Sequence, residues 1–183
     1  MDNFNKSRHM TEISNFRKSL AKEMRGDVLD VGGGLGIYLP YFGGETTVMD
    51  ISQEALNRLD YPKKVIGDAI DMPFPDESFD SVFAMAVCQY FDLSVFVSQV
   101  KRVLRKGGRC TILVPNGKSP WDKVKKVFGL RTWDQQEGIF KQYCANDLKK
   151  YGKVYGEIRF LPWDGFARNH PNIGHCLILK FEK

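Results

Sequence analysis

Glycines and aspartates at a regular spacing form the strongest chemical signal in this sequence. A short apolar run that contains Asp30 leads into Gly32, Gly34 and Gly36, with Gly33 between the first two. Glycine alone adopts positive φ freely and lets a ligand approach the main chain closely. This turn therefore predicts a backbone cradle for a compact ligand with a charged end.

Two further acidic residues follow the turn at equal intervals. Asp50 closes an apolar segment and lies 50 − 32 = 18 positions after Gly32, and Asp68 lies 68 − 50 = 18 positions after Asp50. An acid about 20 positions beyond a glycine turn, at the tip of the second strand, can accept hydrogen bonds from both ribose hydroxyls. The nicotinamide fingerprint would need a glycine at position 37, where the chain has Ile37, so an NAD(P) oxidoreductase is disfavoured.

In this order the motifs resemble those of the class I S-adenosylmethionine-dependent methyltransferases. The likeness is to the type 11 methyltransferases and to the core of the ubiquinone- and menaquinone-biosynthesis methyltransferases. Residues 72–82 resemble the signature before that family's fourth strand, and residues 103–108 resemble its Val-Leu-Lys-Pro-Gly-Gly, with Lys106 replacing the proline. The resemblance covers residues 26–115 and implies an α/β fold. We expect a Rossmann-like, doubly wound, seven-stranded sheet of order 3-2-1-4-5-7-6 with the last strand antiparallel.

The resemblance also implies the cofactor, S-adenosyl-L-methionine, with S-adenosyl-L-homocysteine as the product. Asp30 would bind the ammonium group directly or through water, Asp50 the ribose hydroxyls, and Asp68 the adenine edge. Taken alone, Asp50 and Asp68 could instead cap the helix or turn that follows each of them. The complete expected cofactor-binding set is Asp30, Gly32, Gly33, Gly34, Asp50, Ile51, Asp68, Ala69 and Met85.

No catalytic residue can be carried over from this family. The sulfonium already activates the methyl group for in-line displacement, so the protein mainly positions the acceptor, and a general base is needed only when the acceptor must lose a proton. Tyr90 is one candidate, either as a base or as an aromatic wall of the pocket. His170 is the other, either as a base or as an ordinary surface residue.

Strand and helix patterns alternate along the first two thirds of the chain. Apolar residues at helical spacing predict a helix over about 10–25 that packs on the sheet. The later patterns predict strands over 27–31, 46–50, 63–66, 81–85 and 109–114, a short helix ending at Phe42, and helices from Ser52 and over 93–104. After a helix over about 145–151, strands over 154–161 and 175–181 are joined too closely for a crossover helix and should be antiparallel.

The length and composition indicate one domain over residues 1–183, with 1–26 as a helical cover and 116–143 as a lid or substrate region. Within that lid, Trp121, Val124, Val127 and Phe128 lie on one stripe of a helix, and the lysines between them form either a solvated face or an attractor for an anionic substrate. The net charge of +5 is too mild and scattered to indicate nucleic acid.

The cysteine spacing and the N-terminal residues argue against a metal site and against a signal peptide. The four cysteines contain no C-x-x-C pair, so we expect no metal, and Cys110 and Cys176 should be buried. With neither a long apolar run nor a signal-peptide core, we expect a cytoplasmic protein without a membrane span.

The acceptor is expected to be a small molecule, because residues 84–90 lack the Asn/Asp-Pro-Pro-aromatic motif of base amino-methyltransferases. Cys88 also follows valine rather than the proline typical of cytosine-5 enzymes. An RNA or protein methyltransferase is therefore disfavoured, and a monomer and a homodimer both remain open. The alternative function is a cofactor-binding regulatory or activator subunit without transfer activity.

Overall fold

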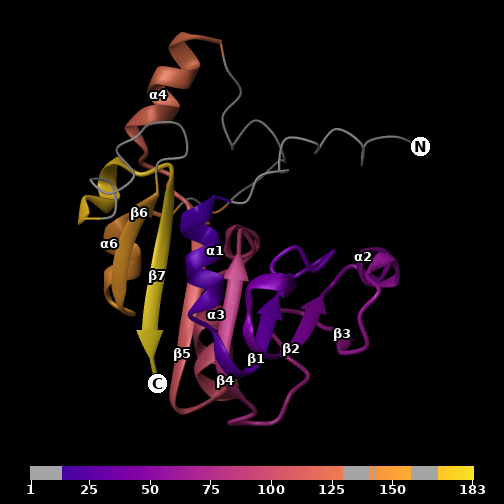
Figure 1. The fold of residues 1–183 in the computed structure, drawn as a ribbon. Coiled ribbons are helices and arrows are strands. Elements are labelled where there is room, and N and C mark those ends of the chain that lie inside the picture. Colours follow the sequence, from indigo (N-terminus) through magenta and orange to yellow (C-terminus); the bar gives the residue numbers. More distant parts are fainter. Residues whose placement is uncertain (1–13, 130–140, 142, 158–168) are drawn as a thin grey trace.

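A mixed β-sheet forms the centre of the computed structural model, which describes residues 14–129, 141, 143–157 and 169–183 (Figure 1). The sheet has seven strands in the order β3-β2-β1-β4-β5-β7-β6. Neighbours among β1 to β5 are parallel, whereas β7 is antiparallel to both β5 and β6. The predicted strand order and the reversed last strand are therefore confirmed. The strands are β1 (Arg25–Val31), β2 (Gly43–Asp50), β3 (Lys64–Ile66), β4 (Phe79–Met85), β5 (Leu104–Pro115), β6 (Lys153–Glu157) and β7 (Cys176–Glu182).

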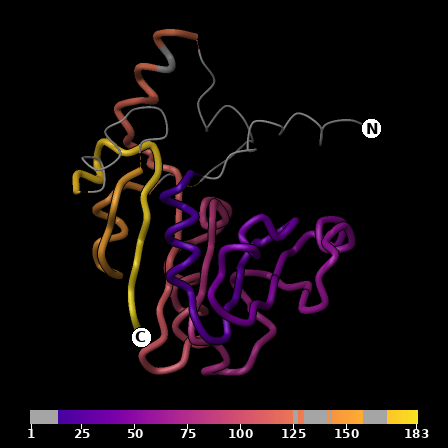
Figure 2. Tube along the Cα trace, in the orientation of Figure 1, coloured from indigo at the N-terminus to yellow at the C-terminus, as the bar shows by residue number. Residues whose placement is uncertain are grey.

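Helices cover both faces of this sheet, because the buried strands are apolar on both sides. On one face, Leu20, Met24 and Phe83 belong to one buried core cluster. On the other face, Phe96 and Leu148 belong to the larger core cluster. Figure 2 traces the backbone in the same orientation as Figure 1. The described helices are α1 (Asn15–Lys22), α2 (Gln53–Arg58), α3 (Leu93–Val103), α4 (Pro120–Val127) and α6 (Ala145–Lys149), with 3-10 turns η2 (Leu39–Tyr41), η3 (Cys88–Tyr90) and η4 (Pro171–Ile173).

The connection between β1 and β2 differs from the expectation. The predicted short helix ending at Phe42 is wrong: the chain forms turns and then the single 3-10 turn η2. Gly36 adopts a φ of +69° and Pro40 cannot donate a backbone hydrogen bond, so an α-helix cannot run through this segment. Gly43 and Gly44 begin β2 rather than ending a helix.

Several other predicted boundaries shift by a few residues. Helix α1 begins after its Ser14 cap and ends at Lys22, so the predicted helix over 10–25 is too long at its C-terminal end, and residues 1–13 lie outside the described chain. Strand β6 ends at Glu157, and the predicted remainder of that strand is also outside the described residues.

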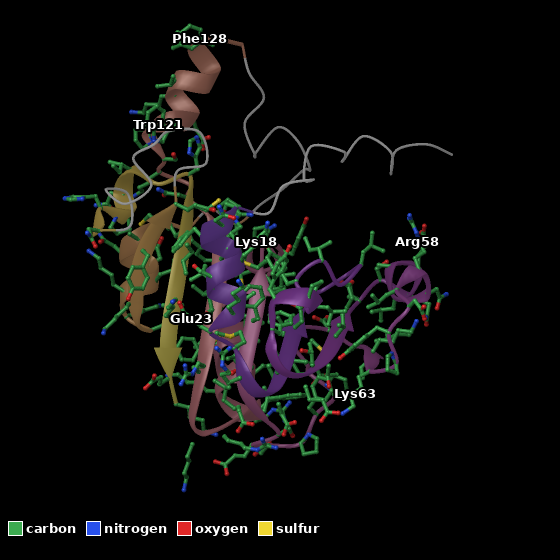
Figure 3. The ribbon with its side chains drawn as sticks, in the orientation of Figure 1. Lys18, Glu23, Arg58, Lys63, Trp121 and Phe128 are labelled. Atoms are coloured by element: carbon green, nitrogen blue, oxygen red, sulfur yellow. The ribbon has the colours of Figure 1, made fainter. Side chains whose placement is uncertain are left out.

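Helix α4 rises beyond the sheet at the carboxyl ends of the parallel strands (Figure 1). The Trp121 ring stacks on His175 at 5.7 Å between centroids. Further along the same helix, Val127 and the following Phe128 are 82% and 74% exposed (Figure 3). The apolar stripe predicted from the sequence therefore starts against the body of the protein and continues into solvent.

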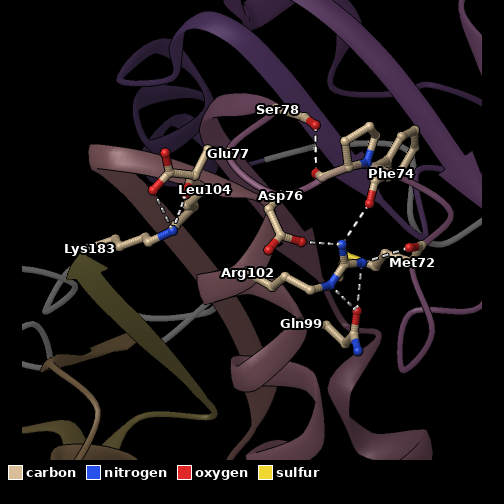
Figure 4. A network of polar contacts seen from close by, with 10 residues as sticks. Met72, Phe74, Asp76, Glu77, Ser78, Gln99, Arg102, Leu104 and Lys183 are labelled. Carbon is tan, nitrogen blue, oxygen red and sulfur yellow. Dashed lines mark hydrogen bonds and ion pairs between the residues drawn. The ribbon is translucent and has the colours of Figure 1, made fainter.

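Arg102 of α3 fixes the loop that leads into β4 (Figure 4). Its guanidinium donates to the carbonyl oxygens of Met72 at 2.8 Å and Phe74 at 2.6 Å, and it pairs with Asp76 at 3.1 Å. This loop follows the Asp68–Asp71 turn, so Arg102 holds in place the chain on which the predicted adenine contacts lie.

A buried ion pair joins α1 to β6, the strand at one edge of the sheet. Arg17 of α1 is 8% exposed and Glu157 at the end of β6 is 0% exposed. The Arg17 Nε and Nη2 atoms both donate to Glu157 Oε2, at 2.9 and 2.6 Å. The Ser14 hydroxyl, which caps α1, donates to Glu157 Oε1 at 2.8 Å. Because both oxygens of the carboxylate are bonded, α1 has a fixed position across the sheet.

Over the part of the chain that the structure describes, we find no helix with the length and apolar character needed to cross a bilayer.

Candidate functional site

A cavity of about 480 Å³ opens where the parallel strands β1 to β4 end. Parallel α/β sheets bind ligands at this edge, where neighbouring connections leave the sheet in opposite directions. The lining is mostly apolar and comes from all four strand ends and the loops after them. It consists of Val31, Gly32, Met49, Asp50, Ile51, Gly67, Asp68, Ala69, Ile70, Met85, Ala86, Val87, Tyr90 and Phe91.

The cavity brings together most of the predicted site residues. The lining includes the expected cofactor contacts Gly32, Asp50, Ile51, Asp68, Ala69 and Met85, together with the acceptor-side candidate Tyr90. Asp30, Gly33 and Gly34 are not part of the lining, but they belong to the strand end and turn that form one wall. His170 does not line the cavity.

The carboxyl group of Asp30 is buried and lacks a hydrogen-bond partner at one of its oxygen atoms. Asp30 is 2% exposed, and the atom without a partner is Oδ2. Burial, with a smaller contribution from the nearby Asp50 carboxylate, raises the pKa of Asp30 from 3.8 to about 7. A cationic group brought to this carboxyl would supply the missing partner and favour its ionised form.

The glycine turn packs so closely that side chains would not fit at its first positions. The Gly32 and Gly33 amides donate to Met49 O at 2.7 and 3.2 Å, which ties the turn to β2. A Cβ atom on Gly32 would lie 2.0 Å from a methyl group of Val87, and one on Gly33 would lie 2.6 Å from Asp30 Oδ2. On Gly34 the nearest atom would be Asp50 Oδ2 at 3.6 Å, so that side of the turn is open.

The Asp50 carboxylate links the glycine turn to the start of α2. Its Oδ2 atom accepts the Gly34 amide at 2.9 Å, and its Oδ1 atom accepts the Ser52 amide at 2.8 Å. The Ser52 hydroxyl in turn caps α2 by accepting the Ala55 amide. Since each carboxylate oxygen has more than one lone pair, Asp50 can hold the turn and still accept hydroxyl donors from a ligand.

The residues predicted to surround adenine lie around the ends of β2 and β3. Ile51 is 71% exposed and presents an apolar surface at the cavity mouth. Asp68 Oδ1 accepts the Ile70 amide at 3.0 Å, so this carboxylate also stabilises its own turn. Asp50 and Asp68 each accept a backbone hydrogen bond from the turn that follows, although Ser52 rather than Asp50 caps α2. Both aspartates also line the cavity.

The segment after β4 forms the opposite wall and contains residues that the motifs did not single out. Ala86 has a φ of +58°, a strained backbone conformation for a residue with a side chain. Ala86, Val87 and Phe91 line the cavity beside Tyr90, which is 58% exposed. Only their position directly after the fourth strand could have indicated them from the sequence.

Two residues with reactive side chains, Cys88 and His170, do not line the cavity. Cys88 is fully buried, and burial raises the pKa of its thiol far above the ordinary value, which disfavours a cysteine nucleophile. His170 is exposed and precedes η4, near the β6 and β7 end of the sheet. In the described part of the chain, no group of three His, Cys, Asp or Glu side chains could hold a metal ion.

We expect the variant Gly32→Ala to lose cofactor affinity and stability together. The new methyl group would collide with Val87, and the φ of +67° disfavours any side chain. The free energy of unfolding should therefore fall by about 2–4 kcal/mol. Urea unfolding and calorimetric titration of S-adenosyl-L-homocysteine would measure the two effects.

Gly107→Ala is the matched control for that substitution. Gly107 has a similar φ of +76°, but no atom lies within 4 Å of the position that a new methyl group would take. It should show the backbone strain alone, about 1–2 kcal/mol, and unchanged ligand affinity. Equal behaviour of the two variants would contradict the close packing of the turn against Val87.

The strand order, the reversed last strand and the cavity at the carboxyl ends define a class I methyltransferase fold. Residues 29–112 match the family described as "Methyltransferase domain". Together with the fold, this match supports the assignment of residues 29–112 to a class I S-adenosylmethionine-dependent methyltransferase domain.

Individual relatives agree with this assignment. The chain is 29% identical to Sterol methyltransferase-like 1 of Botryococcus braunii, over 84% of the chain and 47% of the relative. It is 34% identical to Phosphatidylethanolamine N-methyltransferase of Cereibacter sphaeroides, over 56% of the chain and 58% of the relative. The chain thus spans about half the length of these curated relatives.

A solved structure supports the fold over the full length. The crystal structure of a SAM-dependent methyltransferase from Archaeoglobus fulgidus superimposes with a TM-score of 0.69 and covers 100% of both chains, at 16% identity. At this identity the likeness concerns the fold alone.

Proposed function

We propose that this protein binds S-adenosyl-L-methionine in the cavity at the ends of β1 to β4 and transfers its methyl group to a small, largely apolar acceptor. The observation that carries this proposal is the buried Asp30 carboxyl, whose Oδ2 lacks a partner beside a glycine turn and a cavity. A buried carboxyl without a partner is costly, so its presence here favours a ligand with a cationic end.

The residues present suit the parts of this cofactor. Asp30 would hold the ammonium group and the glycine turn would approach the methionine portion. Asp50 would accept from the ribose hydroxyls, while Ile51, Asp68 and Ala69 would surround the adenine. The sulfonium supplies an activated methyl group, so the protein needs to hold the acceptor in line with it.

Met85 would offer its backbone to the methionine portion, and the wall formed by Ala86, Val87, Tyr90 and Phe91 would then face the acceptor. This wall is largely apolar, and the Tyr90 hydroxyl group can either orient an acceptor or receive its proton. Two of the relatives are named for sterol and phosphatidylethanolamine methylation, which favours an apolar or lipid-like acceptor here as well.

Calorimetric titration with S-adenosyl-L-methionine and S-adenosyl-L-homocysteine tests the cofactor half of the proposal. Heat with both compounds and none with NAD⁺ is the expected result, and no heat with either would overturn it. A methyl-transfer assay with radiolabelled cofactor and a panel of sterols, quinols and phospholipids tests the acceptor half. Tight binding without turnover on any acceptor would instead favour the regulatory subunit.

A further inference from the structure

Exposed apolar side chains gather at one edge of the molecule. In the described residues, each large apolar side chain with substantial exposure ends a parallel strand or belongs to the segment directly after one. Two follow β1, one follows β2, two lie at or after β3, two follow β4 and three follow β5. They are Leu35, Ile37, Ile51, Ile66, Ile70, Tyr90, Val95, Val124, Val127 and Phe128. We call this the apolar edge; the cavity opens within it.

Val127 and Phe128 are adjacent in the chain and are the two most exposed large apolar side chains of the described residues, at 82% and 74%. Isolated exposed apolar residues are normal, but a patch confined to one edge and rimmed by polar groups marks an interaction surface. Phe128 at the tip of α4 projects furthest from the sheet (Figure 3). The connections at the opposite edge contribute none of these exposed apolar side chains in the described part of the chain.

Positive charge accompanies the most exposed part of the apolar edge. The segment 118–128 contains four lysines and one aspartate, a net charge of 4 − 1 = +3 within a chain whose total is +5. Lys118 and Lys123 are exposed, as are Val127 and Phe128. A short helix with apolar and lysine side chains is the composition that binds the headgroup region of anionic membranes.

A second copy of the chain fits this surface poorly. In a two-fold dimer centred on segment 118–128, the positively charged segment of one copy would face that of the other and be repelled by it. An anionic lipid surface complements both the charge and the apolar side chains at once.

We propose that the apolar edge docks on an anionic lipid bilayer, with Val127 and Phe128 inserted among the headgroups and Lys118 and Lys123 on lipid phosphates. Docking in this way turns the cavity mouth toward the bilayer. If the proposed function holds, the acceptor then enters from the membrane rather than from water.

Flotation of the full-length protein with two kinds of vesicle tests this proposal. One kind is pure phosphatidylcholine, and the other contains equal parts of phosphatidylcholine and phosphatidylglycerol. We expect binding to the mixed vesicles, little binding to the neutral ones, and weaker binding as salt increases.

Two double variants with the same change in charge separate insertion from overall electrostatics. Val127→Glu/Phe128→Glu and Lys106→Gln/Arg109→Gln each lower the net charge from +5 to 5 − 2 = +3. The first pair lies on the apolar edge, and the second lies at the opposite edge, where β5 begins. The first should reduce vesicle affinity about tenfold or more, whereas the second should retain most of it.

Three results would overturn the docking proposal. They are wild-type protein that ignores mixed vesicles, equal affinity of the wild type and the Val127→Glu/Phe128→Glu variant, and equal losses in the two double variants. Titration of S-adenosyl-L-homocysteine on the same samples reports on the cofactor site separately, because Val127 and Phe128 do not line the cavity. If the protein fails to bind vesicles but still binds S-adenosyl-L-homocysteine, only the docking proposal is refuted.

Discussion

Asp30→Asn should weaken binding of S-adenosyl-L-homocysteine at pH 8 by about 30-fold or more. The substitution keeps the size of the side chain but removes the negative charge that we propose to hold the ligand's ammonium group. Loss of one charge-assisted hydrogen bond in a buried site is worth about 2–3 kcal/mol, which corresponds to that ratio. Isothermal titration of both proteins at the same pH measures it.

The same variant should make the ligand-free protein more stable at neutral and higher pH. In the folded protein burial raises the pKa of Asp30 to about 7, against 3.8 as its ordinary value. Between these pH values the folded state retains a proton that the unfolded state has lost, so stability falls as pH rises. Between these two pH values the free energy of unfolding of the wild type should fall by up to about 4 kcal/mol because of Asp30. The Asp30→Asn variant should not show this fall.

Asp71→Asn is the control for the affinity measurement. Asp71 is exposed, lies near the same edge and does not line the cavity. Its substitution should leave the affinity for S-adenosyl-L-homocysteine unchanged. Unchanged affinity in Asp30→Asn would refute the proposed ammonium contact, even if the stability gain were observed.

Arg17→Met should produce the largest loss of stability among these substitutions. The substitution would leave the Glu157 carboxylate 0% exposed and without its bidentate partner. Removing one partner of a buried ion pair destabilises a protein by about 3–5 kcal/mol. Urea unfolding measures the change, provided that the free energy of unfolding depends on urea concentration with the same slope in both proteins.

A double variant and a surface pair complete that experiment. Arg17→Met/Glu157→Met removes both charges and should recover most of the lost stability, because no uncompensated ion then remains buried. Lys63→Met breaks the exposed pair with Glu45 and should change stability by less than about 1 kcal/mol. If the double variant were as unstable as Arg17→Met alone, the loss would come from packing rather than from an unpaired charge.

The order of the strands could be predicted because the family resemblance implies it, whereas local patterns alone predict the strands themselves and the antiparallel end of the sheet. Apolar runs ending in Asp30 and Asp50, with short turns after them, are readable as strands of a parallel sheet. The antiparallel end follows from the short connection before Cys176. The helix predicted between β1 and β2 fails because the alternating pattern says nothing of backbone angles, and the positive φ of Gly36 together with Pro40 prevents a helix there.

The sequence predicts the proposed cofactor-binding residues more readily than the proposed acceptor-binding residues, and the reason is physical. A nucleotide requires glycines and acids at defined strand ends, and such residues stand out in a sequence. The proposed acceptor wall includes Ala86, Val87 and Phe91 beside Tyr90, and alanine, valine and phenylalanine are common in any core. The Arg17–Glu157 pair was invisible as well, since its members are 157 − 17 = 140 positions apart and meet only after the sheet has formed.

The 3-10 turn η2 after the glycine loop affects which ligands the site can distinguish. A nucleotide-binding loop that opens a long helix offers aligned backbone dipoles to phosphate groups. Here the loop is followed by turns and only three residues of 3-10 helix, and the carboxyl groups of Asp30 and Asp50 lie close to it. Polyphosphorylated nucleotides such as ATP would therefore be repelled, whereas a nucleoside with a positively charged tail would be retained.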